Sequence, residues 1–218
     1  MSIAFETLKT KQRELRDGFD DSLGLRVHRS ISWLQRAEMA DDDPDAAFIF
    51  FWIAFNAAYA SELDNELFSG ERLVFQDYFV RLINLDSDNR IYDVIWNRYA
   101  HEIRLLLGNR YVYQPFWKDQ NSDPGYEDWA DRFEGSKKVA GRAIKEKDTK
   151  LILSILFDRL YVLRNQLVHG GATWNSSVNR DQVNDGKKIL ASLVPLFIDI
   201  MMDHPDTEWG PPYYPVVD

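Results

Sequence analysis

Hydrophobic residues recur at steps of three and four along almost the whole chain, the spacing of one face of an α-helix. Residues 110–117, RYVYQPFW, alternate briefly, but Pro115 interrupts them, so we expect a loop with an extended piece there. The pattern predicts an all-α fold, a bundle of six to eight helices. The expected helices cover residues 3–17, 23–40, 44–63, 71–85, 88–108, 125–147, 148–169 and 180–203.

The most apolar of these helices begins with a clear start signal. Asp43 is placed to cap the helix and Pro44 suits its first position. The apolar run Ala46 to Ala60 is shorter than the ~20 residues needed to span a bilayer, so we expect a core helix and no membrane partner. Asn56 interrupts this run. A hydrogen bond to a neighbouring helix is the simpler explanation, and a supporting role in a functional cleft is the alternative.

Residues 1–218 read as one helical domain, because no low-complexity linker divides them. The C-terminal stretch WGPPYYPVVD contains three prolines and a glycine, which rule out a helix. Its aromatic residues suggest that residues 204–218 form an extended tail that packs on the body.

Composition excludes several chemistries. The chain has no cysteine, so disulfides, thiolate zinc sites and cysteine nucleophiles are ruled out, which fits a reducing cytoplasmic location. His28, His101 and His204 lack metal-like spacing, and no phosphate-binding glycine motif is present, so we expect no metal and no cofactor. A net charge of −9 argues against a broadly basic surface that coats nucleic acid, but it leaves room for a local basic site.

The helix expected at 148–169 gathers polar residues at its end. Asp158, Tyr161, Asn165 and His169 are spaced 3, 4 and 4 apart and fall in one line, and Arg164 flanks that line. Gly170 and Gly171 then supply the expected helix stop.

Arginine and histidine together are the minimum equipment for metal-free phosphodiester cleavage. The histidine moves protons and the arginine stabilises charge on the phosphorane-like transition state, while an asparagine can orient either group. Basic residues are also common in the last turn of a helix, where the dipole favours them. On residue types alone, simple helix capping therefore stays the leading alternative.

The stretch Arg164 to His169, RNQLVH, resembles the Arg-x(4–6)-His signature of the HEPN superfamily, in its Arg-Asn-x-x-x-His form at a helix end. The chain looks like a stand-alone bacterial HEPN-domain protein, similar to the Apea-like group. The specific motif covers six residues, and a looser helical likeness covers about residues 20–203.

The resemblance implies a HEPN-like bundle that forms a homodimer, with the motifs of two protomers in one composite site. Active members are metal-independent endoribonucleases of toxin–antitoxin, CRISPR and phage-defence systems. The resemblance implies that RNA is the substrate and that an antitoxin or regulatory protein is a further partner. It also implies that Arg164 and His169 are the catalytic pair and that Asn165 supports them. Many such toxins carry a tyrosine two positions after the histidine, where this chain has Gly171. Other members are non-catalytic nucleotide-binding or protein-interaction modules, which is the alternative function.

Further residues are candidates for supporting roles. Asp158 could orient His169 through a bridging residue or pair with Arg164, although a structural ion pair is the simpler role. Tyr161 could stack on a base, although a tyrosine on a bundle helix usually packs in the core. Lys138, Arg142 and Lys145 share a helix face that could follow an RNA backbone, or could simply be a solvated surface.

Overall fold

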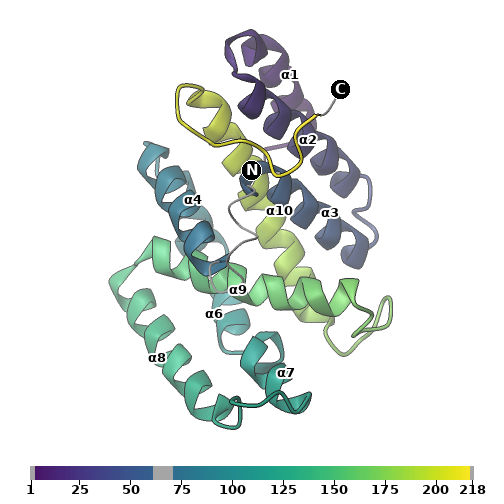
Figure 1. Ribbon diagram of the computed structural model, residues 1–218, viewed down its shortest axis with the longest axis vertical. Coiled ribbons are helices and arrows are strands. Elements are labelled where there is room, and N and C mark those ends of the chain that lie inside the picture. The colour runs from purple at the N-terminus through teal and green to yellow at the C-terminus, as the bar shows by residue number, and fades with distance from the viewer. Residues whose placement is uncertain (1–2, 61–70, 217–218) are drawn as a thin grey trace.

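The fold is all-α, as the periodicity predicts, and the computed structural model describes residues 3–60 and 71–216, with side chains of 71–76 left aside (Figure 1). This described part contains ten α-helices and no strand. The α-helices are α1 Phe5–Leu15, α2 Asp21–Glu38, α3 Pro44–Tyr59, α4 Glu71–Leu85, α5 Arg90–Asp93, α6 Ala100–Leu107, α7 Gln114–Gln120, α8 Trp129–Glu146, α9 Thr149–Val168 and α10 Arg180–Asp203.

Two groups of helices meet along α10. Figure 1 shows α1, α2 and α3 on one side of α10, with α9 crossing it and α6, α7 and α8 beyond α9. Helices α2 and α3 pack along each other, α10 packs on α3, and both α4 and α8 pack on α9. The C-terminal two-thirds of α10 is buried almost without interruption, which makes α10 the central helix of the fold.

The apolar helix α3 lies in the core, as its sequence predicts. Asp43 caps α3 by accepting a hydrogen bond from the Ala46 N–H, and Pro44 occupies its first turn. Phe55 is fully buried and its ring stacks on Phe79 and contacts Phe157 at a centroid distance of 4.5 Å. The helix ends at Tyr59, so the predicted extension to residue 63 falls partly outside the described residues. In the described ranges, no helix is both long and apolar enough to cross a membrane.

Close contact between helices depends on one glycine of α10. A Cβ added to Gly186 would lie 2.7 Å from Cε2 of Phe48 in α3 and 3.1 Å from Cδ2 of Leu160 in α9. Real Cβ atoms do not approach carbon atoms that closely, so the crossing of α3, α9 and α10 requires a residue without a side chain here.

Two sequence predictions in the middle of the chain are wrong. The single helix expected at 88–108 is broken into α5, a π-helical segment Val94–Arg98 and α6, with the break at Tyr99. The loop expected at 110–117 is a 3₁₀ turn, Arg110–Val112, followed by α7. Pro115 lies in the first turn of α7, where proline is tolerated because that N–H has no helical partner. These two errors account for a helix count above the predicted six to eight.

The described tail, residues 204–216, contains no helix and lies against the body. Trp209 is buried, and its indole N–H donates to the His204 carbonyl. The fully buried guanidinium of Arg26 donates to the carbonyls of Gly210 and Pro211 in this segment, and to Ala58 at the end of α3. One buried arginine of α2 therefore ties the tail to the C-terminal end of α3.

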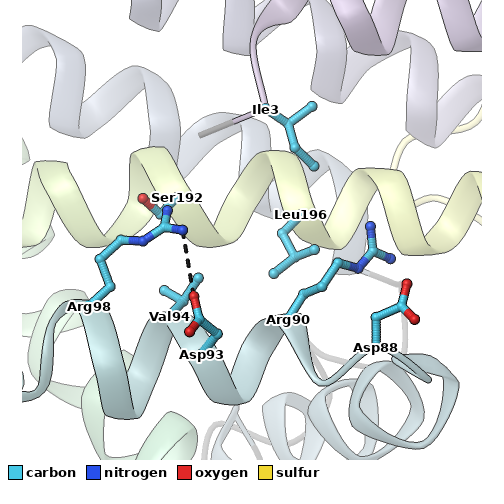
Figure 2. A pocket seen from close by; sticks show the side chains of 8 residues that line it. All are labelled: Ile3, Asp88, Arg90, Asp93, Val94, Arg98, Ser192 and Leu196. Atoms are coloured by element: carbon cyan, nitrogen blue, oxygen red, sulfur yellow. Dashed lines mark ion pairs between the residues drawn. The ribbon is translucent and has the colours of Figure 1, made fainter. Parts of the chain in front are cut away.

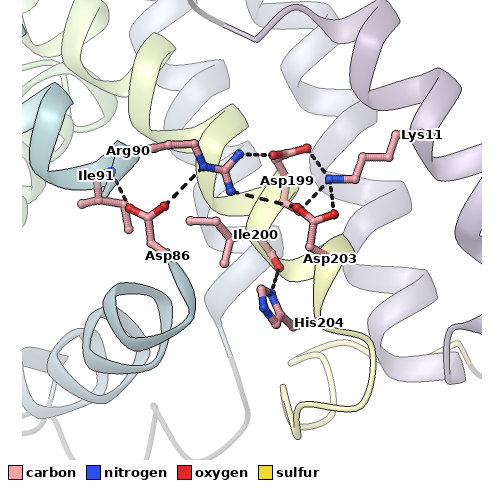
Figure 3. Close-up of polar contacts among 8 residues, drawn as sticks. All are labelled: Lys11, Asp86, Arg90, Ile91, Asp199, Ile200, Asp203 and His204. Atoms are coloured by element: carbon pink, nitrogen blue, oxygen red, sulfur yellow. Dashed lines mark hydrogen bonds and ion pairs between the residues drawn. The ribbon is translucent and has the colours of Figure 1, made fainter. Parts of the chain in front are cut away.

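An ion network fastens α1 and α5 to the far end of α10 (Figure 3). Lys11 contacts Asp199 at 2.5 Å and Asp203 at 2.6 Å, while Arg90 contacts the other oxygen of Asp199 at 2.5 Å. Asp86 accepts from Arg90 and from the Ile91 N–H. Burial lowers the pKa of Arg90, but the two aspartates that it contacts outweigh this effect and raise that pKa above its ordinary value.

Candidate functional site

The candidate site lies at the C-terminal end of α9, where the backbone closes the helix without help from the histidine. The Gly171 N–H donates to the Gln166 carbonyl at 2.7 Å, and the Gly170 N–H donates to the Leu167 carbonyl at 3.4 Å. Gly170 has a φ of +70°, the left-handed conformation that this kind of helix stop uses. The glycines thus form the predicted helix stop, and no side chain is needed to satisfy these last carbonyls.

His169 follows the last helical residue and its side chain is exposed. Its backbone N–H donates to the Asn165 carbonyl, which continues the helical pattern. The described residues offer its imidazole ring no hydrogen bond and no ion pair. The imidazole ring therefore faces solvent and makes no polar contact that would stabilise the described part of the fold.

Arg164 and Asn165, the other two motif residues, contact each other directly. Nη1 of Arg164 donates to Oδ1 of Asn165 at 2.9 Å, and both side chains are partly buried. A bidentate phosphate contact needs only two of the five guanidinium N–H donors, so this bond leaves enough of them for an anion. The bond restricts the arginine to one side of α9. The structure thus joins two of the three predicted catalytic residues, and shows no direct bond between either and the His169 ring.

The loop after His169 is fastened to the start of α3. Trp174 donates its indole N–H to Asp43 at 3.0 Å, and the Asn175 N–H donates to Asp45 at 2.8 Å. Arg180 contacts both carboxylate oxygens of Asp45, at 3.2 and 3.0 Å. These contacts position the chain that leaves the candidate site.

Asp43 serves both α3 and this loop. Its slight burial raises the pKa of the carboxyl, but hydrogen bonds from the Ala46 N–H and the Trp174 indole outweigh that effect and bring the pKa below its ordinary value. The anionic form is therefore the one that holds the two elements together.

The 110–117 segment, which the sequence predicted only as a loop, also reaches this end of α9. Gln166 donates to the Tyr111 carbonyl at 2.5 Å, and the Trp117 indole donates to the same oxygen at 2.7 Å. Arg110 lies over the Tyr111 ring and is exposed. Arg110 is thus an additional cation on a segment bound to the motif helix. The available signal was Arg110 next to several aromatic residues in RYVYQPFW, but the sequence pattern predicted only a loop with an extended piece there.

The candidate supporting residues are placed away from the motif or in the core. Asp158 is partly exposed on α9, eleven residues and so roughly 16 Å along the axis from His169. The Tyr161 ring packs on Trp52 of α3 at a centroid distance of 6.1 Å, which favours the core role. Oδ1 of Asn56 is buried, and the described residues give it no hydrogen-bond donor. Among the described residues, the predicted hydrogen bond to a neighbouring helix is thus not formed by this oxygen.

The basic face of α8 is solvated, since Lys138, Arg142 and Lys145 are all exposed. Arg142 and Lys145 lie in the last turns of α8, next to the start of α9, and the 20 residues of α9 span about 30 Å (Figure 1). The middle of α8 lies closer to the motif, because Arg159 of α9 donates a hydrogen bond to Ser136 of α8 at 2.8 Å. No contact joins this basic face to the motif residues in the described part of the chain.

In comparisons with known proteins, no family model, no curated protein and no solved structure matches this chain. The resemblance to the HEPN superfamily consequently rests on the six-residue motif and its helical setting.

Proposed function

We propose that this protein is a metal-independent endoribonuclease of the HEPN class, acting as a homodimer in a toxin or phage-defence role. The observation that supports this proposal is that the end of α9 is completed by glycines and backbone groups and does not use the His169 side chain. Glycines and backbone groups complete the helix stop, so the exposed His169 ring is left without a structural task. A histidine is able to exchange protons near neutral pH, and Arg164 belongs to the same motif.

The proposed reaction is a transesterification. The 2′-hydroxyl oxygen attacks the adjacent phosphorus and loses its proton, the bond from phosphorus to the 5′-oxygen breaks, and that oxygen gains a proton. His169 handles these protons, and the Arg164 guanidinium stabilises the added negative charge on the phosphoryl oxygens. Asn165 holds Arg164 through the bond described above. The products carry a 2′,3′-cyclic phosphate and a 5′-hydroxyl.

A homodimer supplies what one protomer lacks. One histidine can remove the 2′-hydroxyl proton while a second donates to the leaving oxygen, so two copies of the motif in one cleft provide both groups. Exposed apolar side chains surround this end of α9: Val168 is 48 % exposed, Trp174 75 % and Val178 90 %. These side chains support an association surface beside the motif, because solvent-exposed apolar groups gain from burial.

The test is cleavage of tRNA and total RNA in EDTA by the purified protein. We expect the wild-type protein to cleave and His169→Ala and Arg164→Ala to lose at least 100-fold in rate. His101→Ala and Arg104→Ala, which change exposed residues of α6, are the matched controls and keep full activity. A 2′,3′-cyclic phosphate resists phosphatase until the ring is opened. Product ends that show this behaviour identify the reaction as the proposed transesterification. Equal cleavage by wild type and both motif variants, or by none of them, would contradict the proposal.

The alternative function is a non-catalytic nucleotide-binding or protein-interaction module that uses the same surface. The exposed Trp174 and Val178 favour a protein partner over free RNA, as does the net charge of −9. Binding of a protein or nucleotide that is lost in Arg164→Ala, without any RNA turnover, selects this module over the enzyme.

A further inference from the structure

A second site, separate from the α9 motif, lies between α10 and the α5–π segment (Figure 2). It is a pocket of about 360 Å³, within the size range of small-ligand sites. Val94 and Leu196 are buried in its lining and Ile3 contributes a further apolar group. The π-helical segment Val94–Arg98 forms one wall, and such wide turns recur at functional sites.

One end of the pocket carries an arginine with spare hydrogen-bonding capacity. Arg98 has an ion pair with Asp93 at 3.6 Å, too long for a good hydrogen bond, and the described residues give its guanidinium no other partner. Ser192 of α10 lines the same end and is 6 % exposed, and its hydroxyl lies 3.0 Å from the Tyr99 hydroxyl. This end can accept a carboxylate through the guanidinium fork.

The other end of the pocket is acidic. Asp88 is exposed, and within the described part of the chain no cation pairs with it. Arg90 also lines this end, but its guanidinium is already bound by Asp86 and Asp199. The ion network beside this end has a net charge of −2. It has two cations, Lys11 and Arg90, and four carboxylates, those of Asp86, Asp88, Asp199 and Asp203. This end therefore favours a cation.

Apolar groups lie between these two ends. Figure 2 shows Arg98 and Ser192 at one side, Asp88 at the other, and Val94 and Leu196 between them, with Asp93 and Arg90 beside these two apolar residues. Arg90 and Arg98 are eight residues apart, at most about 12 Å along the axis, because the π-helical part rises less per residue than an α-helix. An extended chain covers 3.3–3.6 Å per residue, so about three residues match this span. We propose that this pocket binds a short apolar peptide, with its ammonium group at Asp88 and its carboxylate at Arg98 and Ser192.

The experiment is calorimetric titration of the full chain with four forms of one tripeptide. The probes are Ala-Leu-Ala, its N-acetyl form, its C-terminal amide and the doubly blocked peptide. We expect the free peptide to bind and each single block to weaken binding at least tenfold, because each block removes one charge. If the free peptide does not bind at millimolar concentration, or if all four forms bind equally, the proposal is overturned.

Variants assign the two ends. Arg98→Gln should bind the free peptide no better than wild type binds the amide, and Asp88→Asn no better than wild type binds the acetylated form. Arg104→Gln, at an exposed position of α6 outside the pocket lining, is the control and should bind as wild type does. Wild-type affinity in Arg98→Gln would overturn the assignment. If a variant does not fold, the blocked peptides on the wild-type protein still decide the question.

Discussion

Replacing Gly186 with alanine tests how the three central helices are held together. In an open helix, glycine to alanine stabilises by about 1 kcal/mol, because alanine restricts the unfolded chain and favours the helix. At Gly186 the new Cβ would lie 2.7 Å from the Phe48 ring and 3.1 Å from Leu160. Forcing a methyl group into a filled core costs about 1–3 kcal/mol. We therefore expect Gly186→Ala to lower the free energy of unfolding by about 1 kcal/mol, combining these two effects.

A second glycine of the same chain provides the matched control. Gly141 lies in the exposed middle of α8, and a Cβ there would meet nothing within 4 Å. Gly141→Ala should therefore stabilise the protein by about 0.5–1 kcal/mol. The difference between the two variants isolates the contact with Phe48 and Leu160, since the helix propensity gain is common to both.

These effects are measured as free energies of unfolding in urea. The proteins compared are the wild type, the two alanine variants, and Phe48→Leu with and without Gly186→Ala. Phe48→Leu removes the ring edge that the new methyl group meets, so Gly186→Ala should cost less in that background. For a chain of this length, 1 kcal/mol corresponds to about 2–4 °C in Tm. If Gly186→Ala stabilises as much as Gly141→Ala, the close crossing at Gly186 is refuted.

Three further changes test other contacts. Asp43→Asn keeps the helix cap but removes a carboxyl whose pKa lies below its ordinary value of 3.8. In the wild type, the carboxylate stabilises the folded state above that pH, and this stabilisation disappears as the pH falls through the lowered pKa. Wild type should thus lose stability relative to Asp43→Asn only below about pH 4, and parallel acid-unfolding curves would contradict this. Arg26→Met removes three hydrogen bonds to carbonyls, one buried and two partly buried, and should cost about 3 kcal/mol. It should also release Trp209, seen as a red shift in tryptophan fluorescence, and unchanged emission would argue that Arg26 does not hold the tail. Gly170→Ala should cost about 1 kcal/mol because of its positive φ, whereas His169→Ala should leave Tm unchanged; a large loss of stability in His169→Ala would mean that the ring has a structural role.

Most of the fold was readable from the sequence where helices carry strong end signals. The start of α3 at Asp43 and Pro44, and the stop of α9 at Gly170, follow from local hydrogen bonding that neighbours in sequence determine. The break between α5, the π-helical segment and α6 could not be predicted from the sequence. A π-turn inserts one residue into a helix and changes the spacing of the apolar residues only slightly. Helix α7 was not predicted, because it is seven residues long and Pro115 in its first turn interrupts the sequence pattern of a longer helix.

The candidate site was only partly readable. The pairing of Arg164 with Asn165 joins neighbours in sequence, but the attachment of Gln166 to Tyr111 and of Trp174 to Asp43 joins segments 55 and 131 residues apart. Such pairings depend on tertiary packing, which hydrophobic periodicity does not specify. The charged pocket between α10 and the π segment was hidden for the same reason, since Asp88, Arg98 and Ser192 carry no motif.

The attachment of the 170–180 loop to Asp45 has a genetic consequence. Asp45 holds the Asn175 N–H and the Arg180 guanidinium, so the shape of the chain after His169 depends on a residue more than a hundred positions earlier. A selection for variants that lose the proposed ribonuclease activity should therefore recover alleles in two separate stretches of the gene. The alleles near codon 45 would look unrelated to the motif, although they act through the loop that leaves it.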